Sequence, residues 1–430
     1  MVYLQKIDPP EGERGRGRRR RWTYLPPPSG SAAELEGVEL LNEIPNVLGL
    51  LLFQRYRDVL LWNQTPVPSR RRLFDDRGQR LLVGGEEPDL SSALVEPLRT
   101  LERMVRTGKG EEVVQACSAI ASWGYDGGLL ATAAAYSRLA AIVSPTDPDL
   151  AFAAGRATRD GGYHSLAEAW FQRTISLGRR AANEEAKAAG YLGWGVLEEQ
   201  RGRRRAARSR FERALRTATG AGLARMAGLA HQYLMALTVP DGTFTEGLEH
   251  GIAAVRYFAD DDPKLIRLAI DLGAFVSEHG YFNTALSLYE AALPFLVRPA
   301  DRLAGLANIG RAAAATGRKR RFAEVWAEFD RLSLSPPKLF YAESLIELAH
   351  GATTLRYWRH ASRMIEEAVV VAREQGNDHS LTAARALEHL VASKQSGDAP
   401  RPPDPVLERL ANRVIKRLQV LNASSGAAPG

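Results

Sequence analysis

The sequence predicts an all-α protein built from consecutive helical hairpins. The clearest stretch is residues 188–218, where two helical patterns, at about 188–200 and 204–217, lie on either side of Gly202. Glycine suits a tight turn at that position because it tolerates a positive φ. The second observation is that this arrangement returns at a fixed spacing along much of the chain.

The two helices of this stretch carry small and large residues at positions that would meet in a hairpin. We expect Gly195 in the first helix to face Ala207 in the second, so that the two backbones approach closely. Phe211 and Ala214 lie on the same face of the second helix as Ala207. An isolated hairpin of this size cannot bury that face, so the pattern predicts neighbouring hairpins.

The same features recur every 38–40 residues. The position of Ala207 is matched at Gly127, Ala167, Gly247, Ala285, Ala323 and Ala361. The turn glycine recurs at Gly162, Gly242, Gly280 and Gly317, and the small residue of the first helix at Gly155, Gly273 and Gly310. A large residue follows four positions later at Phe171, Phe211, Tyr289 and Ile365. This periodicity predicts a repeat architecture.

This joint pattern resembles the tetratricopeptide repeat (TPR), a helix–turn–helix unit of about 34 residues. The resemblance covers roughly residues 110–376 and is strongest at 188–217 and 268–293. It implies a TPR-like α-solenoid, a right-handed superhelix of helical hairpins, with longer loops or helix ends than usual. One unit slips by one residue, since Gly310 and Gly317 fit one register and Ala323 fits the next.

The chain order predicts seven hairpins over 110–376 with further segments on either side. The expected helix pairs are 110–123 with 126–142, 147–160 with 163–177, 183–201 with 204–218, 221–238 with 244–258, 263–279 with 282–297, 301–316 with 319–332, and 337–354 with 358–375. The remaining segments are a disordered basic arm (1–34), a helical capping region with a loop (35–109), a capping helix (377–393), a linker (394–404), an amphipathic helix (405–422) and a tail (423–430).

Composition limits the class of protein. The net charge is +7, and the excess of arginine over lysine is most simply explained by a GC-rich, bacterial-like genome. The single cysteine, Cys117, excludes an intrachain disulfide and a multi-cysteine zinc site. The apolar run from Val47 to Phe53 is far shorter than the roughly 20 residues of a membrane span. We therefore expect a cytoplasmic protein without a membrane span.

Catalytic, cofactor and metal motifs are not found. His231 and His250 fall near opposite ends of one helix pair, and neither has a second ligand at metal spacing. The Asp260–Asp262 run lacks the alternating ligands and central glycine of a calcium loop. We therefore expect no enzyme activity, no cofactor and no metal.

The TPR resemblance implies a binding surface on the concave wall formed by the first helix of each hairpin. The residues expected to face this groove are Arg156, Arg159, Gln232, Arg267, Asn308, Arg311 and His350. The leading hypothesis is a non-enzymatic scaffold that binds a protein or peptide segment there. The alternative is a regulatory sensor that acts with a separate transcription regulator, and the oligomeric state is left open.

A third hypothesis concerns the amino-terminal arm. Residues 1–22 carry seven cations against three carboxylates, and the arm ends in Trp22 and Tyr24. Its arginines are Arg14, Arg16, Arg18, Arg19, Arg20 and Arg21. Arginine beside aromatic rings suits phosphate contact and base stacking, so the arm is a candidate for binding nucleic acid or an acidic partner.

The carboxy-terminal helix has an apolar stripe formed by Leu407, Leu410, Val414, Leu418 and Leu421. Such a stripe needs a partner surface. We expect residues 405–422 to dock onto the helical array or to mediate self-association.

Overall fold

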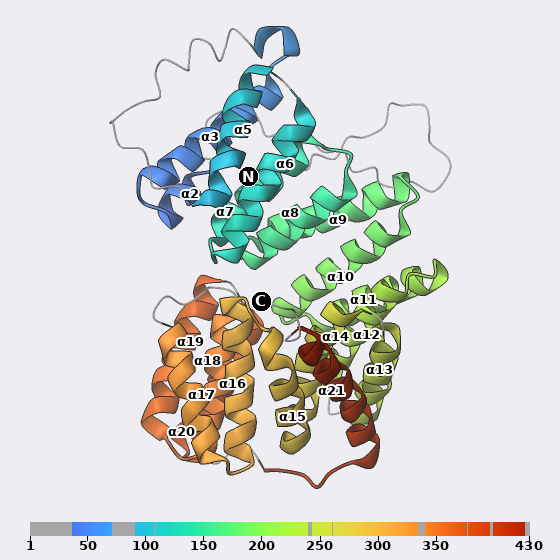
Figure 1. Ribbon diagram of the computed structural model, residues 1–430, viewed down its shortest axis with the longest axis vertical. Helices are drawn as coiled ribbons and strands as arrows, with labels where there is room; N and C mark the ends of the chain where they lie inside the picture. The colour runs from blue at the N-terminus through green and yellow to red at the C-terminus, as the bar shows by residue number, and fades with distance from the viewer. Residues whose placement is uncertain are drawn as a thin grey trace. The chain divides into compact units, whose positions relative to one another are not determined.

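A computed structural model of the protein describes residues 37–70, 91–107, 109–239, 243–259, 261–333, 340–375, 377–395 and 399–425 (Figure 1). The regular elements in these residues are all helical. The chain divides within α10 (Glu184–Gln200) into two compact units, Met1–Gly190 and Tyr191–Gly430. None of the helices in these ranges combines the length and the apolar character needed to cross a membrane.

The first unit is built from neighbouring helices that pack in chain order. They are α2 (Val38–Glu43), α3 (Val47–Gln64), α5 (Ser92–Thr107), α6 (Gly110–Asp126), α7 (Leu130–Val143), α8 (Pro148–Asp160) and α9 (His164–Arg180). From α5 onward each of these helices packs on the next. Asp147 caps α8, because its carboxylate accepts hydrogen bonds from the Asp149 and Leu150 amides, and Pro148 occupies the first turn.

The second unit is also built from neighbouring helices that pack on one another. Its helices are α11 (Arg204–Gly220), α12 (Ala224–Thr238), α13 (Phe244–Tyr257), α14 (Asp262–Glu278), α15 (Phe282–Ala292), α16 (Pro299–Ala315), α17 (Lys319–Leu332), α18 (Tyr341–Thr354), α19 (Trp358–Glu374), α20 (Asp378–Ala392) and α21 (Pro405–Ser425). The hairpins are α12–α13, α14–α15, α16–α17 and α18–α19, and each packs as a pair. In each hairpin we call the earlier helix the first helix and the later one the second helix.

The turns of the hairpins confirm the predicted role of glycine. Gly162, Gly202, Gly280 and Gly317 all have a positive φ, between 69° and 83°. At the turn after α10, the Arg203 amide donates to the Glu198 carbonyl over 2.8 Å, which closes the helix end. Arg356 takes the left-handed conformation, with φ 65°, in the α18–α19 turn. Gly242 lies outside the described residues.

The small residues of the first helices make room for the large residues of the second. A Cβ atom on Gly195 would overlap the ring of Phe211, and one on Gly273 would overlap the ring of Tyr289. Gly155 faces Phe171 in the same way. The predicted small and large positions therefore meet. The residue that lies closest to Gly195 is Phe211, however, and not Ala207 as expected.

The predicted ladder of small residues is wrong at two positions. Gly127 lies in the turn between α6 and α7 and not on a helix, because α7 begins only at Leu130. Ala323 is exposed, whereas Phe322 beside it is buried. The one-residue slip in this hairpin therefore turns Phe322 to the core and Ala323 to solvent. Ala167, Ala207, Ala285 and Ala361 are fully buried, as expected.

Both units are stacks of TPR-like helical hairpins, which confirms the predicted fold class. α21 packs along α13, α14 and α15 and buries the predicted stripe residues Leu407, Leu410, Val414 and Leu418 (Figure 1). Docking onto the array is thus the observed use of this helix. The domain boundaries drawn from the sequence stay predictions.

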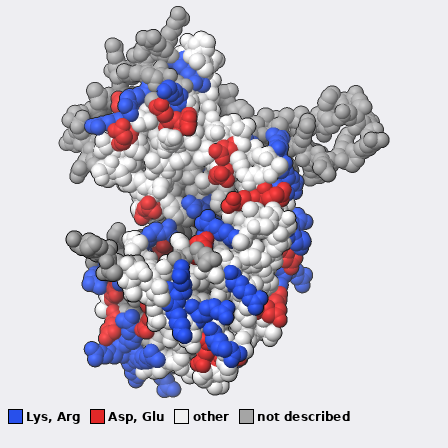
Figure 2. All heavy atoms as spheres, turned by 45° about the vertical axis from the view of Figure 1, so that its right-hand side comes forward, with Lys and Arg blue, Asp and Glu red and all other residues white. Residues whose placement is uncertain are grey.

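Charges of both signs are interspersed on the surface. Figure 2 shows Lys and Arg side chains gathered on the lower part of one face, with Asp and Glu between them. Many arginines pair with carboxylates, as Arg208 does with Glu246 and Arg302 does with Glu328. The Arg-rich arm, Arg14 to Arg21, falls outside the described residues.

Candidate functional site

Polar side chains link the first helices of the second unit to one another. α12 packs on α14, α14 on α16 and α16 on α18. Between α12 and α14, the Gln232 amide donates to the Asp271 carboxylate. Arg267, one turn earlier on α14, places its Nε 3.3 Å from Asp271 Oδ1. One carboxylate therefore holds groups from two neighbouring first helices.

Arg311 forms the next link along this surface. Its guanidinium on α16 contacts Glu278 of α14 and lies 3.1 Å from Glu347 Oε2 of α18. The Arg311 side chain is only 6% exposed, whereas those of Glu278 and Glu347 are 38% and 28% exposed. A buried arginine between two partly exposed carboxylates ties three first helices together and leaves acidic oxygens at the surface.

α18 is linked to α20 by Glu343. Its Oε1 accepts a hydrogen bond from Asn377 Nδ2 over 2.7 Å and another from Ser380 Oγ over 3.0 Å. Asn377 also caps α20, since its Oδ1 accepts from the Ser380 amide. The polar links thus run from α12 to α20. We call the surface that carries Gln232, Arg267, Asp271, Glu278, Arg311 and Glu347 the first-helix face.

The seven residues predicted for the groove are divided between the two units. Arg156 and Arg159 belong to the first unit, and the other five belong to the second. Gln232 and Arg311 are 3% and 5% exposed, so they connect helices and offer little free surface. Arg267 is exposed, and its guanidinium carbon lies 5.3 Å from the centre of the Phe340 ring.

Asn308 on α16 and His350 on α18 are both half-buried. They lie on the first helices, as predicted, and leave part of the side chain open to solvent. Their role in binding stays a prediction.

In the first unit, Arg156 and Arg159 lie near Tyr125 of α6. The Arg156 guanidinium carbon is 5.0 Å from the centre of the Tyr125 ring, and the Tyr125 hydroxyl donates to Asp160. Arg159 donates to the same carboxylate, with its Nε 2.8 Å from Asp160 Oδ1. Burial, together with the nearby Asp160 carboxylate, raises the pKa of Tyr125 well above its usual value. The phenol therefore stays a hydrogen-bond donor.

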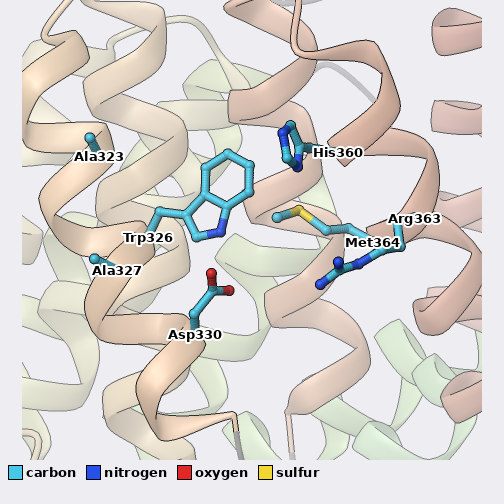
Figure 3. A pocket seen from close by; sticks show the side chains of 7 residues that line it. All are labelled: Ala323, Trp326, Ala327, Asp330, His360, Arg363 and Met364. Atoms are coloured by element: carbon cyan, nitrogen blue, oxygen red, sulfur yellow. The ribbon is translucent and has the colours of Figure 1, made fainter.

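A surface pocket of about 360 Å³ lies on the second helices and not on the first-helix face. Figure 3 shows Ala323, Trp326, Ala327 and Asp330 on one side of it, facing His360, Arg363 and Met364 on the other. These are residues of α17 and α19. The ring centres of Trp326 and His360 are 4.9 Å apart and edge to face. This pocket could not be predicted from the sequence, because its lining comes from two helices in different hairpins.

The structure also brings together two histidines that sequence spacing separated. His231 of α12 and His250 of α13 place their Nδ1 atoms 2.8 Å apart, with ring centres 5.1 Å apart. Burial, with the neighbouring His250, lowers the pKa of His231 to about 4. Two rings that meet through their Nδ1 atoms share a hydrogen bond, which requires a neutral acceptor ring. A third ligand is lacking, for no group of three or more His, Cys, Asp or Glu side chains suited to a metal occurs among the described residues.

Comparison with known proteins finds similarity among solved structures only. No family model matches it, and no curated protein does. Among solved structures, it is similar to a Rap protein complexed with competence and sporulation factor, at 13% identity and a TM-score of 0.43 over 70% of this chain and 98% of that one. It is also similar to a protein from Pyrococcus horikoshii described as a Signal Transduction ATPase with Numerous Domains (STAND) protein with a tetratricopeptide repeat sensor. The identity is 12% and the TM-score is 0.44, over 91% of this chain and 69% of that one.

Proposed function

We propose that the protein is a non-enzymatic scaffold that binds a peptide segment of a partner protein on the first-helix face of the second unit. The observation that carries the proposal is the row of polar side chains that links α12, α14, α16 and α18. A surface shared by several helices suits an extended ligand that makes many shallow contacts.

The chemistry of this face suits a peptide with both charged and polar side chains. Arg267 is exposed beside the Phe340 ring and offers a cation to a ligand carboxylate. Glu278 and Glu347 offer acceptors on either side of Arg311. Because Arg311 is buried between them, these carboxylates are held in place before any ligand binds, which reduces the entropy cost of binding.

The test is a peptide array probed with the purified full-length chain, followed by affinity measurement for the best peptide. We expect Arg267→Ala to weaken binding by roughly tenfold, which is a loss of about 1.4 kcal/mol. Arg320→Ala is the matched control, because Arg320 is also exposed and also pairs with a carboxylate four residues later, but on the second helix α17.

Equal affinities for the Arg267→Ala variant and the wild type would contradict a binding role for this face, provided that the two proteins melt at the same temperature. Loss of binding in the Arg320→Ala variant alone would move the site to the second helices. The same array decides whether any peptide is bound at all.

A further inference from the structure

The outer face of α21 carries a stripe of exposed cations that is separate in its residues from the proposed peptide site. The inner face of α21 is buried on α13, α14 and α15. Its outer face holds Arg409, Arg413, Lys416 and Arg417, all exposed, and Glu408 is the one carboxylate within Pro405–Ser425. We call these four cations the α21 stripe.

An exposed valine flanks the α21 stripe at each end along the helix. Val406 and Val420 are 42% and 57% exposed, and both are among the few large hydrophobic side chains exposed in the described chain. At 100° per residue, the two valines and the four cations fall within an arc of about 100°. They extend over about 21 Å, which is roughly four helical turns.

This arrangement favours one class of partner. Arg409, Arg413 and Lys416 are four and three residues apart, a spacing that matches carboxylates at the same spacing on a second helix. Arginine also forms paired hydrogen bonds with a carboxylate. The exposed valines add apolar contact at each end, which a protein helix supplies and a sugar–phosphate backbone does not. A second copy of the stripe is disfavoured because like charges repel.

Insertion into a membrane surface is also disfavoured. An interfacial helix inserts its apolar face, but Leu407, Leu410, Val414 and Leu418 of α21 are already buried against the array. Val406 and Val420 are the large hydrophobic side chains that α21 leaves exposed for lipid contact.

We propose that the outer face of α21 docks an acidic amphipathic helix of a partner protein. This surface lies on α21 and is separate in its residues from the first-helix face, so a chain could bind one segment at each. Electrostatic complementarity then favours fast association and selects acidic segments.

The experiment measures binding of a synthetic helical peptide to the full-length chain by fluorescence anisotropy. The peptide carries glutamates four residues apart with a leucine at each end. We expect the wild type to bind it, with affinity that falls as salt is raised, because exposed charges are screened. A peptide with glutamine in place of glutamate should not bind.

Two double variants distinguish an effect of the α21 stripe on binding from an effect of net charge. Arg409→Glu/Arg413→Glu reverses the middle of the stripe and should weaken binding at least tenfold. Arg205→Glu/Arg213→Glu changes the net charge equally at two exposed arginines of α11 and should stay within about twofold of the wild type. All four positions are exposed, so we expect unchanged melting curves.

Absence of binding by the wild type would overturn the proposal, as would equal binding by the stripe variant. Duplex DNA and phosphatidylserine vesicles are tested beside the peptide. Tighter binding to either one, lost in the stripe variant, would also overturn it and assign the stripe to that ligand. The Arg267→Ala variant should bind the acidic peptide normally, so the two binding surfaces are judged separately.

Discussion

At the scale of single residues, Gly195 shows why the hairpins need small side chains at fixed places. Its missing side chain leaves the space that the ring of Phe211 fills. We expect Gly195→Ala to lower the free energy of unfolding by about 1–3 kcal/mol, because the added Cβ overlaps that ring. Gly220→Ala is the control, since nothing lies within 4 Å of the Cβ that it adds. Chemical denaturation of both variants measures the difference, and equal stabilities would refute the packing role.

The pair formed by His231 and His250 predicts how stability depends on pH. Burial lowers the pKa of both rings in the folded protein, so the unfolded chain binds protons more readily. Stability from His231 is present above its unfolded pKa of about 6.5 and is lost as pH falls toward about 4. We therefore expect the melting temperature to fall over that window, and to fall less in a His231→Gln variant. Identical pH profiles for the two proteins would contradict this account.

At the scale of helices, α21 depends on tertiary contacts for its place. Leu418 is fully buried and Gln419 beside it is exposed. We expect Leu418→Ala to destabilise the protein by about 2–5 kcal/mol, as for other buried leucines, and Gln419→Ala to change it by less than about 0.5 kcal/mol. Thermal melts measure both. A neutral Leu418→Ala would mean that the helix does not rest on the array in solution.

Much of the helical pattern could be predicted from the sequence, because it depends on local chemistry. Turn glycines act within a few residues, so the turn at Gly202 could be predicted from the chain alone. The register near Ala323 was predicted wrongly, since a shift of one residue leaves the composition of the helix unchanged. Phe322 indicates the correct register, because a large aromatic residue is a better candidate for the core than the alanine beside it.

The candidate site was only partly predictable. Sequence position placed Arg311 and Gln232 on first helices, but burial depends on the neighbouring helices that supply Glu278 and Asp271. His231 and His250 meet for the same reason, since helices α12 and α13 bring residues 19 positions apart into contact.

At the scale of the whole molecule, the amino-terminal arm remains a separate hypothesis. We expect that any nucleic-acid binding depends on residues 1–22 and has a log–log salt slope of roughly −3 to −5, from four to six phosphate contacts. Deletion of these residues should abolish it and leave the melting temperature unchanged. Equal retention of nucleic acid by the full-length and shortened proteins across a salt titration would remove this role from the arm.

We propose that the first-helix face of the second unit binds a protein segment. Amide hydrogen exchange of the full-length chain, with and without the tightest peptide from the array, tests it most directly. We expect the peptide to slow exchange in α12, α14, α16 and α18. Protection confined to the second helices α13, α15, α17 and α19, with no change in the first helices, would contradict it.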